Sequence, residues 1–395
     1  MYKKFYFILK LIFVFSILFD INFNFISSFT TARVALVSLV CITLLRKDRI
    51  SLSCIYYFLW VGVILMFSTI QFIYSNDFNQ SSRLIWFNLY GVLTPFLFVN
   101  YIKNRNEFFL LISIAVLIQA FLTILSYLNP SIKQVFSNLI IYTSNFDESN
   151  TLRAMGFASV GGASLSVIQS CGIISLLILL KINVWSIIEK ILIWVGILIV
   201  LISIFFIGRT GLFISIFAFL VYFISISFNI KNWIIATLII VGVSQINYLK
   251  LIENVTSNIS GFKSELFISW IENSFQIKGN ETKEDLSKMP IPPLSFNTII
   301  GAGRVVKING FGNASGHDSG YIQTYYSLGL ILSIIFYLSY FYFLLFNSNK
   351  QKILYLLIII TFIIEIKEPF IFHYSFPFFV LSSILIFGKK NSIKK

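Results

Sequence analysis

Charged side chains are scarce in this chain of 395 residues. Only 12% of the residues are Asp, Glu, Lys or Arg, whereas 57% are hydrophobic, and the mean hydropathy is +0.86. A water-soluble fold cannot bury that much apolar surface, so the composition excludes a soluble globular protein. It predicts an integral membrane protein.

The sequence also lacks the usual residues of disulfide, metal and nucleotide sites. The three cysteines, Cys41, Cys54 and Cys171, all fall within apolar segments, which excludes a disulfide framework and a zinc-ligand spacing. There is no phosphate-binding G-x-x-x-x-G-K-[ST] motif and no H-E-x-x-H motif. With only two histidines and no close pair of aspartates, we expect a site without a metal ion or a cofactor.

Long apolar segments are abundant instead. A membrane-crossing helix needs about 20 mainly apolar residues. The sequence predicts an all-α polytopic membrane protein in which residues 1–395 form a single integral membrane domain. About twelve transmembrane helices are expected, at 5–19, 29–45, 52–74, 84–101, 108–128, 160–180, 187–207, 211–229, 232–248, 319–346, 353–372 and 374–388.

The placement of lysine and arginine predicts the orientation of these spans. With the N-terminus inside, the cytoplasmic segments hold 17 of these cations and the short outer segments hold five. Cytoplasmic loops carry the excess of positive charge in membrane proteins, so we expect both termini in the cytoplasm. Topogenic cations also explain most of the net charge of +14, and we therefore expect no nucleic-acid partner.

Two loops on the predicted outer face are long, at 129–159 and 249–318. Loops of this length are usually functional or disordered. In the second loop, apolar residues recur at three- and four-residue steps between Ile252 and Trp270, which predicts an amphipathic helix. We therefore expect one long, partly helical periplasmic loop.

The end of this loop, GAGRVVKINGFGNASGHDSGYIQTYYSLG at 301–329, combines several groups that could do chemistry. A neutral imidazole at His317 could accept a proton from a sugar hydroxyl, and Asp318 could orient it or act in its place. The alternative is that Asp318 or Ser319 caps the helix that follows. Both interpretations can hold, since the start of a helix also attracts anions.

Arginines are the second group of candidates, because a guanidinium makes two parallel hydrogen bonds to a phosphate group. Arg209 lies between two apolar spans and is flanked by glycines, and an outer-face cation runs against the topological rule. We expect it to form the other half of an active site with His317; the alternative is an arginine that snorkels to the interface. For Arg153 and Arg304, the alternative is an ordinary solvated loop cation.

Three further residues near the predicted outer face are candidates for substrate binding. Tyr321 and Tyr325 share a face of the predicted helix, where their rings could stack on sugars or belong to the interfacial aromatic belt. Glu365 lies deep enough in the span 353–372 to need a partner, and an arginine of the site would serve. Ion pairing and acid–base catalysis both remain open for this carboxylate.

Three stretches resemble those of the bacterial O-antigen polymerase and O-antigen ligase superfamily. They are SIFFIGRTGLF at 203–213, RAMGFASVGGASL at 153–165, and the loop-closing stretch at 301–330. The twelve-span layout with one dominant outer loop is also similar to this family. Ligases usually show His-Asn in the third stretch, whereas His317-Asp318 here is closer to the polymerase.

The resemblance implies a GT-C-like fold and a metal-independent, inverting glycosyl transfer on the periplasmic face of the bacterial inner membrane. The donor would be a glycan on undecaprenyl pyrophosphate, and the acceptor a lipid-linked repeat unit. Arg209, Arg153 and Arg304 would bind the pyrophosphate, while His317 would contact or deprotonate the acceptor hydroxyl with support from Asp318. A flippase and a chain-length regulator are the implied partners.

Two alternatives have a different activity. A ligase of the same fold would transfer the glycan to the lipid A core. A polytopic transporter or flippase would have no transferase activity, and it should place its key polar residues near the middle of the bilayer, with repeats and broken helices. The candidates here cluster at the predicted outer rim instead.

Overall fold

The computed structural model describes residues 2–26, 29–48, 50–142, 155–226, 288–308, 312–349 and 351–388. Within these ranges the ordered elements are helices, and the loops between them make only isolated β-bridges. Six helices in the described ranges are long and apolar enough to cross a membrane. The prediction of an all-helical fold is thus confirmed for the described residues, and their long apolar helices are compatible with a membrane protein, while the twelve spans and the GT-C-like fold stay predictions.

Two of the sequence predictions lie outside the described residues: the span 232–248 and the amphipathic helix between Ile252 and Trp270. The chain divides into two compact units, which are described in turn. Unit 1 comprises Met1–Thr30 and Phe109–Glu281, and unit 2 comprises Thr31–Phe108 and Thr282–Lys395.

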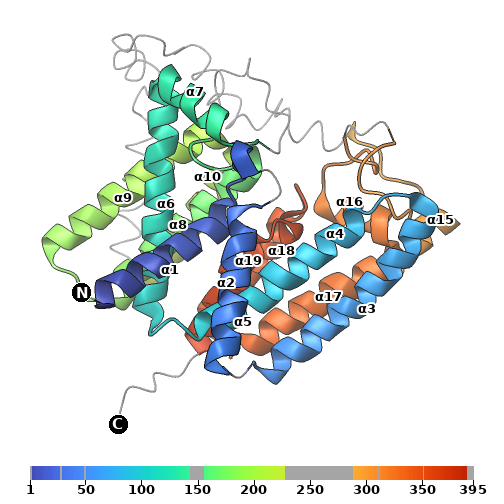
Figure 1. Ribbon diagram of the computed structural model, residues 1–395, viewed down its shortest axis with the longest axis horizontal. Helices are drawn as coiled ribbons and strands as arrows, with labels where there is room; N and C mark the ends of the chain where they lie inside the picture. Colours follow the sequence, from blue (N-terminus) through green and yellow to red (C-terminus); the bar gives the residue numbers. More distant parts are fainter. Residues whose placement is uncertain are drawn as a thin grey trace. The chain divides into compact units, whose positions relative to one another are not determined.

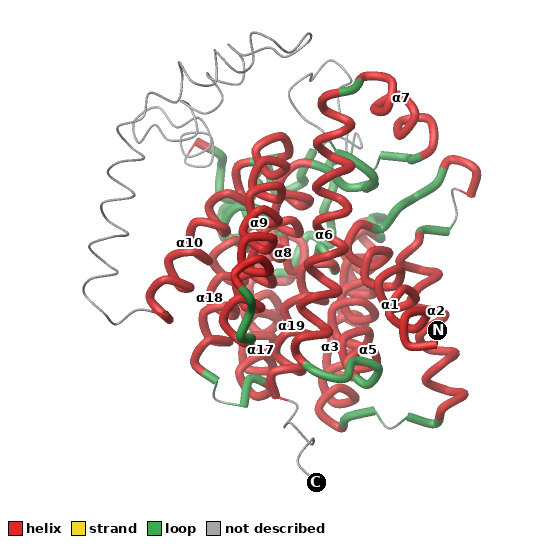
Figure 2. The backbone as a smooth tube through the Cα atoms, turned by 90° about the vertical axis from the view of Figure 1, so that its left-hand side faces the viewer, coloured by secondary structure: helices red, strands yellow, loops and turns green. Residues whose placement is uncertain are grey.

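Unit 1 is built around one buried helix. Its described helices are α1 (Tyr2–Phe19), the 3-10 turn η1 (Asn24–Ile26), α6 (Arg105–Leu128, from Phe109 on), α7 (Pro130–Leu139), α8 (Gly162–Ile182), α9 (Ile187–Ile207) and α10 (Arg209–Ile226). Helix α8 packs against both α9 and α10 (Figure 2). The apolar window of α8 is 83% buried by protein, against 39% for α9, so α8 forms the centre of this unit.

Helix α7 occupies part of the long loop predicted at 129–159, where no helix was expected from the sequence. The side chain of Asn129 accepts a hydrogen bond from the backbone N–H of Ser131, and Pro130 is the first helical residue. An asparagine followed by proline is a common start of a helix, because the side chain satisfies a free N–H and the proline ring fixes φ. This local signal was present in the sequence.

Unit 2 contains the remaining described helices. They are α2 (Thr31–Arg46), α3 (Leu52–Ser75), α4 (Asn79–Trp86), the π-helical η2 (Phe87–Leu93), α5 (Thr94–Val99), α15 (Phe296–Ile300), α16 (Gly320–Leu328), α17 (Leu330–Asn347), α18 (Lys352–Ile364), the 3-10 turn η3 (Phe370–Phe372) and α19 (Ser375–Gly388). Helix α3 contacts α4 and α17 (Figure 1), and α19 packs on η2 and α5. Stacked and edge-on rings of Phe87, Phe336, Tyr340 and Phe372 fill the core.

The prediction of one span at 319–346 is wrong. The chain forms the short helix α16, breaks at Gly329 and continues as α17. Gly329 has φ 92° and ψ 159°, a region that essentially only glycine can enter. The predicted span 353–372 is also interrupted: α18 ends at Ile364 and a turn leads to Pro369 and η3.

Hydrogen bonds at the two ends of unit 2 join segments that the charge pattern expects on the same side of the membrane. At one end, the segments expected to be cytoplasmic meet, since Arg105 and Gln351 both donate hydrogen bonds to the carbonyl of Phe387. At the other end, the segments expected to be outside meet, since Asp77 accepts a hydrogen bond from the backbone of Val305. Each set of loops therefore gathers at its own end of the helices.

Candidate functional site

The chain on both sides of His317 is hydrogen-bonded to the end of α3. Nε2 of Gln71 donates hydrogen bonds to the carbonyls of Ile300 (2.6 Å) and Leu328 (2.9 Å). The hydroxyl of Tyr74 donates to the carbonyl of Gly301 at 2.7 Å. One buried amide thus joins two chain segments that both lie more than two hundred residues further along the sequence.

Arg304 is also hydrogen-bonded to the end of α3. Its Nε donates a hydrogen bond of 3.0 Å to the carbonyl of Ser75, the last residue of α3. The guanidinium therefore satisfies a free carbonyl at a helix end, where a positive charge is favourable. The expected pyrophosphate contact of Arg304 stays a prediction, and its side chain has this structural contact as well.

Asp77 closes the connection between α3 and the outer loop. Its carboxylate accepts hydrogen bonds from the backbone N–H groups of Asn79 (2.9 Å), Val305 (2.9 Å) and Val306 (3.3 Å). Burial raises the pKa of Asp77, but these hydrogen bonds outweigh it and hold the pKa below the ordinary value of 3.8. The charged form is therefore the one that the fold stabilises.

We expect Asp77→Asn to reduce the stability of unit 2 at neutral pH by about 1 kcal/mol, because it weakens charge-assisted hydrogen bonds that are partly exposed. Since the pKa is depressed on folding, this stabilisation is fully present above pH 3.8 and disappears as the pH falls through the folded-state pKa. Thermal unfolding in detergent at several pH values measures it. A gap between wild type and Asp77→Asn that persists below the folded-state pKa would contradict this assignment.

His317 is buried and its imidazole has a defined orientation. Nδ1 accepts a hydrogen bond of 3.0 Å from the backbone N–H of Ser319. The hydroxyl of Ser315 donates to the backbone carbonyl of His317 and accepts from its backbone N–H. Because Nδ1 is an acceptor, the proton of the neutral ring is on Nε2. In this geometry His317 offers an N–H donor to a ligand, whereas the sequence suggested a proton acceptor.

Asp318 is exposed, and its carboxylate bonds to Asn313 and not to His317. Oδ1 accepts a hydrogen bond of 2.9 Å from the side-chain amide of Asn313, and the backbone carbonyl of Asp318 accepts one from Nε2 of Gln323. Within the described residues, the imidazole of His317 is oriented by the backbone of Ser319 and not by Asp318. Ser319 is the N-cap residue of α16, although its side chain makes no capping hydrogen bond there.

Glu365 is completely buried at the end of α18. Its Oε1 accepts a hydrogen bond of 2.8 Å from the hydroxyl of Tyr337, and Oε2 accepts one of 2.9 Å from the backbone N–H of Ile371. The backbone N–H of Gly320 donates to the carbonyl of Glu365 at 2.9 Å. A side chain at position 320 would collide with the carboxylate, so a glycine there lets the start of α16 approach Glu365.

Arg83 on α4 is the functional candidate that the sequence reasoning missed. Its guanidinium is half-buried, donates from Nη1 to Oε1 of Gln323 (3.4 Å), and interacts electrostatically with Glu365 and Asp77. In the sequence it counted only as one of the outer-face cations. The signal that could have found it is its position in the first turns of the apolar run Asn79–Val99.

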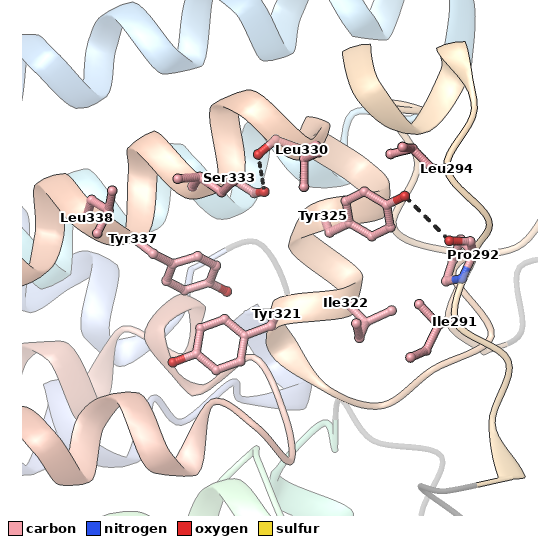
Figure 3. Close-up of a pocket in the computed structure, with 11 residues that line it drawn as sticks. Ile291, Pro292, Leu294, Tyr321, Ile322, Tyr325, Leu330, Ser333, Tyr337 and Leu338 are labelled. Atoms are coloured by element: carbon pink, nitrogen blue, oxygen red, sulfur yellow. Dashed lines mark hydrogen bonds between the residues drawn. The ribbon is translucent and has the colours of Figure 1, made fainter.

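A groove of about 600 Å³ lies beside this cluster and includes both predicted tyrosines. Rings of Tyr321, Tyr325 and Tyr337 line it, together with aliphatic side chains of α17 and of the segment 291–294 (Figure 3). The hydroxyls are engaged elsewhere: Tyr321 donates to the carbonyl of Phe362 (2.7 Å) and Tyr325 to that of Pro292 (3.4 Å). The walls of the groove are therefore mainly apolar.

Arg209 belongs to unit 1 and is half-buried as the first residue of α10. The flanking glycines bring α10 against α8: the backbone N–H of Gly211 donates to Oγ of Ser166 (3.1 Å), and a Cβ at Gly211 would overlap the backbone of Ser166. The start of α10 is thus held in one position by a close helix contact. Arg153 lies outside the described residues.

Comparisons of the chain with protein-family models, with curated proteins and with solved structures found no match. Its function is therefore inferred from its own residues, above all His317, Arg83 and Glu365 of unit 2.

Proposed function

We propose that the protein is an oligosaccharide repeat-unit polymerase with about twelve transmembrane helices and a GT-C-like fold. It transfers a glycan from undecaprenyl pyrophosphate to a lipid-linked repeat unit on the periplasmic face of the bacterial inner membrane. The observation that carries the proposal is the arrangement of the stretch 301–330. Its sequence resembles the loop-closing pattern of the O-antigen polymerases, and its fold presents the Nε2–H donor of His317 beside the start of α16.

The reaction is an inverting displacement. The acceptor hydroxyl oxygen forms a bond to the anomeric carbon of the donor sugar, and the bond from that carbon to the pyrophosphate oxygen breaks. The departing pyrophosphate gains negative charge and takes up the hydroxyl proton. Fixed donors aimed at this growing charge lower the barrier, and we assign this role to Arg209 and to the Nε2–H of His317. Arg153 and Arg304 contribute further positive charge to substrate binding.

The apolar groove gives a place for the lipid part of the substrate. The hydroxyls of Tyr321 and Tyr325 are already bonded to backbone carbonyls, and that of Tyr337 to the carboxylate of Glu365, so the surface of the groove suits a hydrocarbon chain better than a sugar. Neighbouring residues of α17, such as Ile334 and Leu338, are exposed and apolar, as expected for a surface in contact with lipid. We assign Tyr321 and Tyr325 to the lipid chain of the donor rather than to its glycan.

One observation favours the transporter alternative. The break at Gly329 makes α16 and α17 a discontinuous helix, a feature that transporters use at their binding sites. A transporter moves lipid-linked units across a bilayer without joining them. The product of the purified protein therefore distinguishes the two functions, because only a polymerase makes chains of increasing length.

The test is a reconstituted reaction. Purified protein in liposomes, supplied with a lipid-diphosphate-linked repeat unit and a metal chelator, should produce a ladder of polymer lengths. Arg209→Ala should lower the rate by about 10²- to 10³-fold, the usual effect of removing a donor that stabilises the transition state. Lys190→Ala, which removes an exposed cation of α9, is the matched control and should leave the ladder unchanged. Absence of a ladder from wild type, or transfer only to lipid A core, would reject the polymerase.

A further inference from the structure

The guanidinium of Arg83 has more hydrogen-bond donors than the protein uses. An arginine carries five N–H donors. In the described part of the chain, one of them is engaged, from Nη1 to Oε1 of Gln323. At 3.4 Å this bond is longer than the usual 2.7–3.2 Å for N–H···O. A half-buried cation in an apolar run is costly, so its remaining donors call for an acceptor.

The two carboxylates whose charges act on Arg83 do not fill this need. Both oxygens of Glu365 accept from other donors, namely the hydroxyl of Tyr337 and the backbone N–H of Ile371. Both oxygens of Asp77 accept backbone N–H groups of the segments beside it. Among the described residues, neither acid is hydrogen-bonded to the guanidinium. The two acids thus favour a positive charge at Arg83 without occupying its donors.

Gln323 holds the guanidinium beside the His317 turn. While its Oε1 accepts from Arg83, its Nε2 donates to the backbone carbonyl of Asp318 at 2.9 Å. The same turn carries the Nε2–H of His317, a second donor without a partner in the described part of the chain. One amide side chain therefore places Arg83 next to the residues that the proposed reaction uses.

We propose that Arg83 binds a phosphate group, held in position by Gln323. A planar guanidinium with free adjacent N–H groups matches the oxygens of a phosphate in a bidentate manner. Identification of this phosphate as part of the lipid diphosphate donor rests on the proposed function, whereas the phosphate site itself does not. Arg83 is then a substrate-binding residue in addition to Arg209.

Binding to purified protein in nanodiscs of zwitterionic lipid tests the site without requiring turnover. The probes are farnesyl diphosphate, farnesol and inorganic diphosphate. We expect Arg83→Ala to weaken the binding of farnesyl diphosphate by about 10- to 100-fold, in line with the loss of a bidentate charge-assisted contact. Farnesol binding should not change. Arg83→Lys, which keeps the charge but loses the planar fork, should fall between wild type and Arg83→Ala.

Arg46→Ala is the matched control. Arg46 is an exposed cation of the same unit, 5.3 Å from the ring centre of Tyr101, and its removal should leave binding of farnesyl diphosphate unchanged. Unaltered binding in Arg83→Ala would overturn the proposal. An equal loss of farnesol and farnesyl diphosphate binding would also overturn it, since the substitution would then act on the fold or on the groove.

Two further measurements separate this site from the polymerase function. If phosphatidylglycerol in the nanodisc displaces farnesyl diphosphate in an Arg83-dependent way and the diphosphate gives no preference, the site binds a phospholipid head group and the donor assignment fails. If binding depends on Arg83 but wild type makes no ladder, the phosphate site stands and the polymerase falls. If Arg83→Ala makes a normal ladder, the polymerase stands and Arg83 is not its substrate ligand.

Discussion

Alanine in place of Gly329 should strongly destabilise unit 2. Gly329 has φ 92° and ψ 159°, so a Cβ is strained there, and that atom would lie 2.5 Å from the carbonyl oxygen of Ile299 and 2.6 Å from the backbone nitrogen of Gly301. Both neighbours are backbone atoms, which cannot rotate away. Together, strain and overlap should cost about 3–5 kcal/mol, a large share of the stability of a typical domain.

The measurement is thermal unfolding of the purified variant, followed by loss of the monodisperse peak in detergent. Gly62→Ala is the matched control, because Gly62 lies within α3 of the same unit and a Cβ there meets nothing within 4 Å. In a helix interior, alanine is more favourable than glycine by roughly 0.5–1 kcal/mol, so the control should be unchanged or slightly more stable. Equal unfolding temperatures for the two variants would show that α16 and α17 do not meet α15 in this way.

Removal of the His317 imidazole should abolish long polymer while the protein remains inserted in the membrane. His317→Ala takes away the Nε2–H donor and the Nδ1 acceptor that bonds the N–H of Ser319. Loss of one such donor at a transition state typically costs about 10²- to 10³-fold in rate. The measurement is the polymer ladder of the reconstituted protein, with the amount of inserted protein determined in parallel.

His317→Gln distinguishes a donor from a base. The glutamine amide can offer an N–H near the place of Nε2 but cannot accept a proton at neutral pH, so a donor role predicts partial activity. The expected rank is therefore wild type, His317→Gln and then His317→Ala. If the glutamine variant is as inactive as the alanine variant while it still binds farnesyl diphosphate, proton transfer at Nε2 is required and the donor role is wrong.

The long apolar runs were readable from the sequence, and the structure places α3, α8 and α9 within a few residues of their predicted positions. The break at Gly329 could not be predicted, because hydropathy does not show a change of chain direction inside an apolar run. The glycine itself was the local sign of the break in the sequence. The helix α7 was missed because the search for long apolar runs does not detect a short helix in a polar loop, although Asn129 and Pro130 mark its start.

The candidate site shows the same limit. His317 and Glu365 could be selected from their chemistry and their rarity in apolar surroundings. Contacts between segments that are distant in the sequence could not be predicted. An example is Arg304, whose Nε donates a hydrogen bond to the carbonyl of Ser75, 229 positions earlier in the chain. Arg83 looked like an ordinary outer-face cation because its neighbours Gln323 and Glu365 are far along the chain. Arg209 belongs to unit 1, and Arg153 lies outside the described residues. The roles that the sequence suggests for these two arginines stay predictions.

The wide turns of η2 determine the direction in which Arg83 points. This π-helical segment, Phe87–Leu93, follows α4 directly and packs against α19, where Gly91 leaves room for Pro377. A π-helical turn holds one residue more than an α-helical turn, and each residue of an α-helix rotates the chain by about 100°. If the same residues ran as a continuous α-helix, the segment would turn the chain further, and relative to α5 it would swing the guanidinium by roughly a quarter of a turn or more, away from Gln323. Conversion of η2 to an α-helix of unchanged length would thus turn the arginine away from the site without changing any residue that touches it.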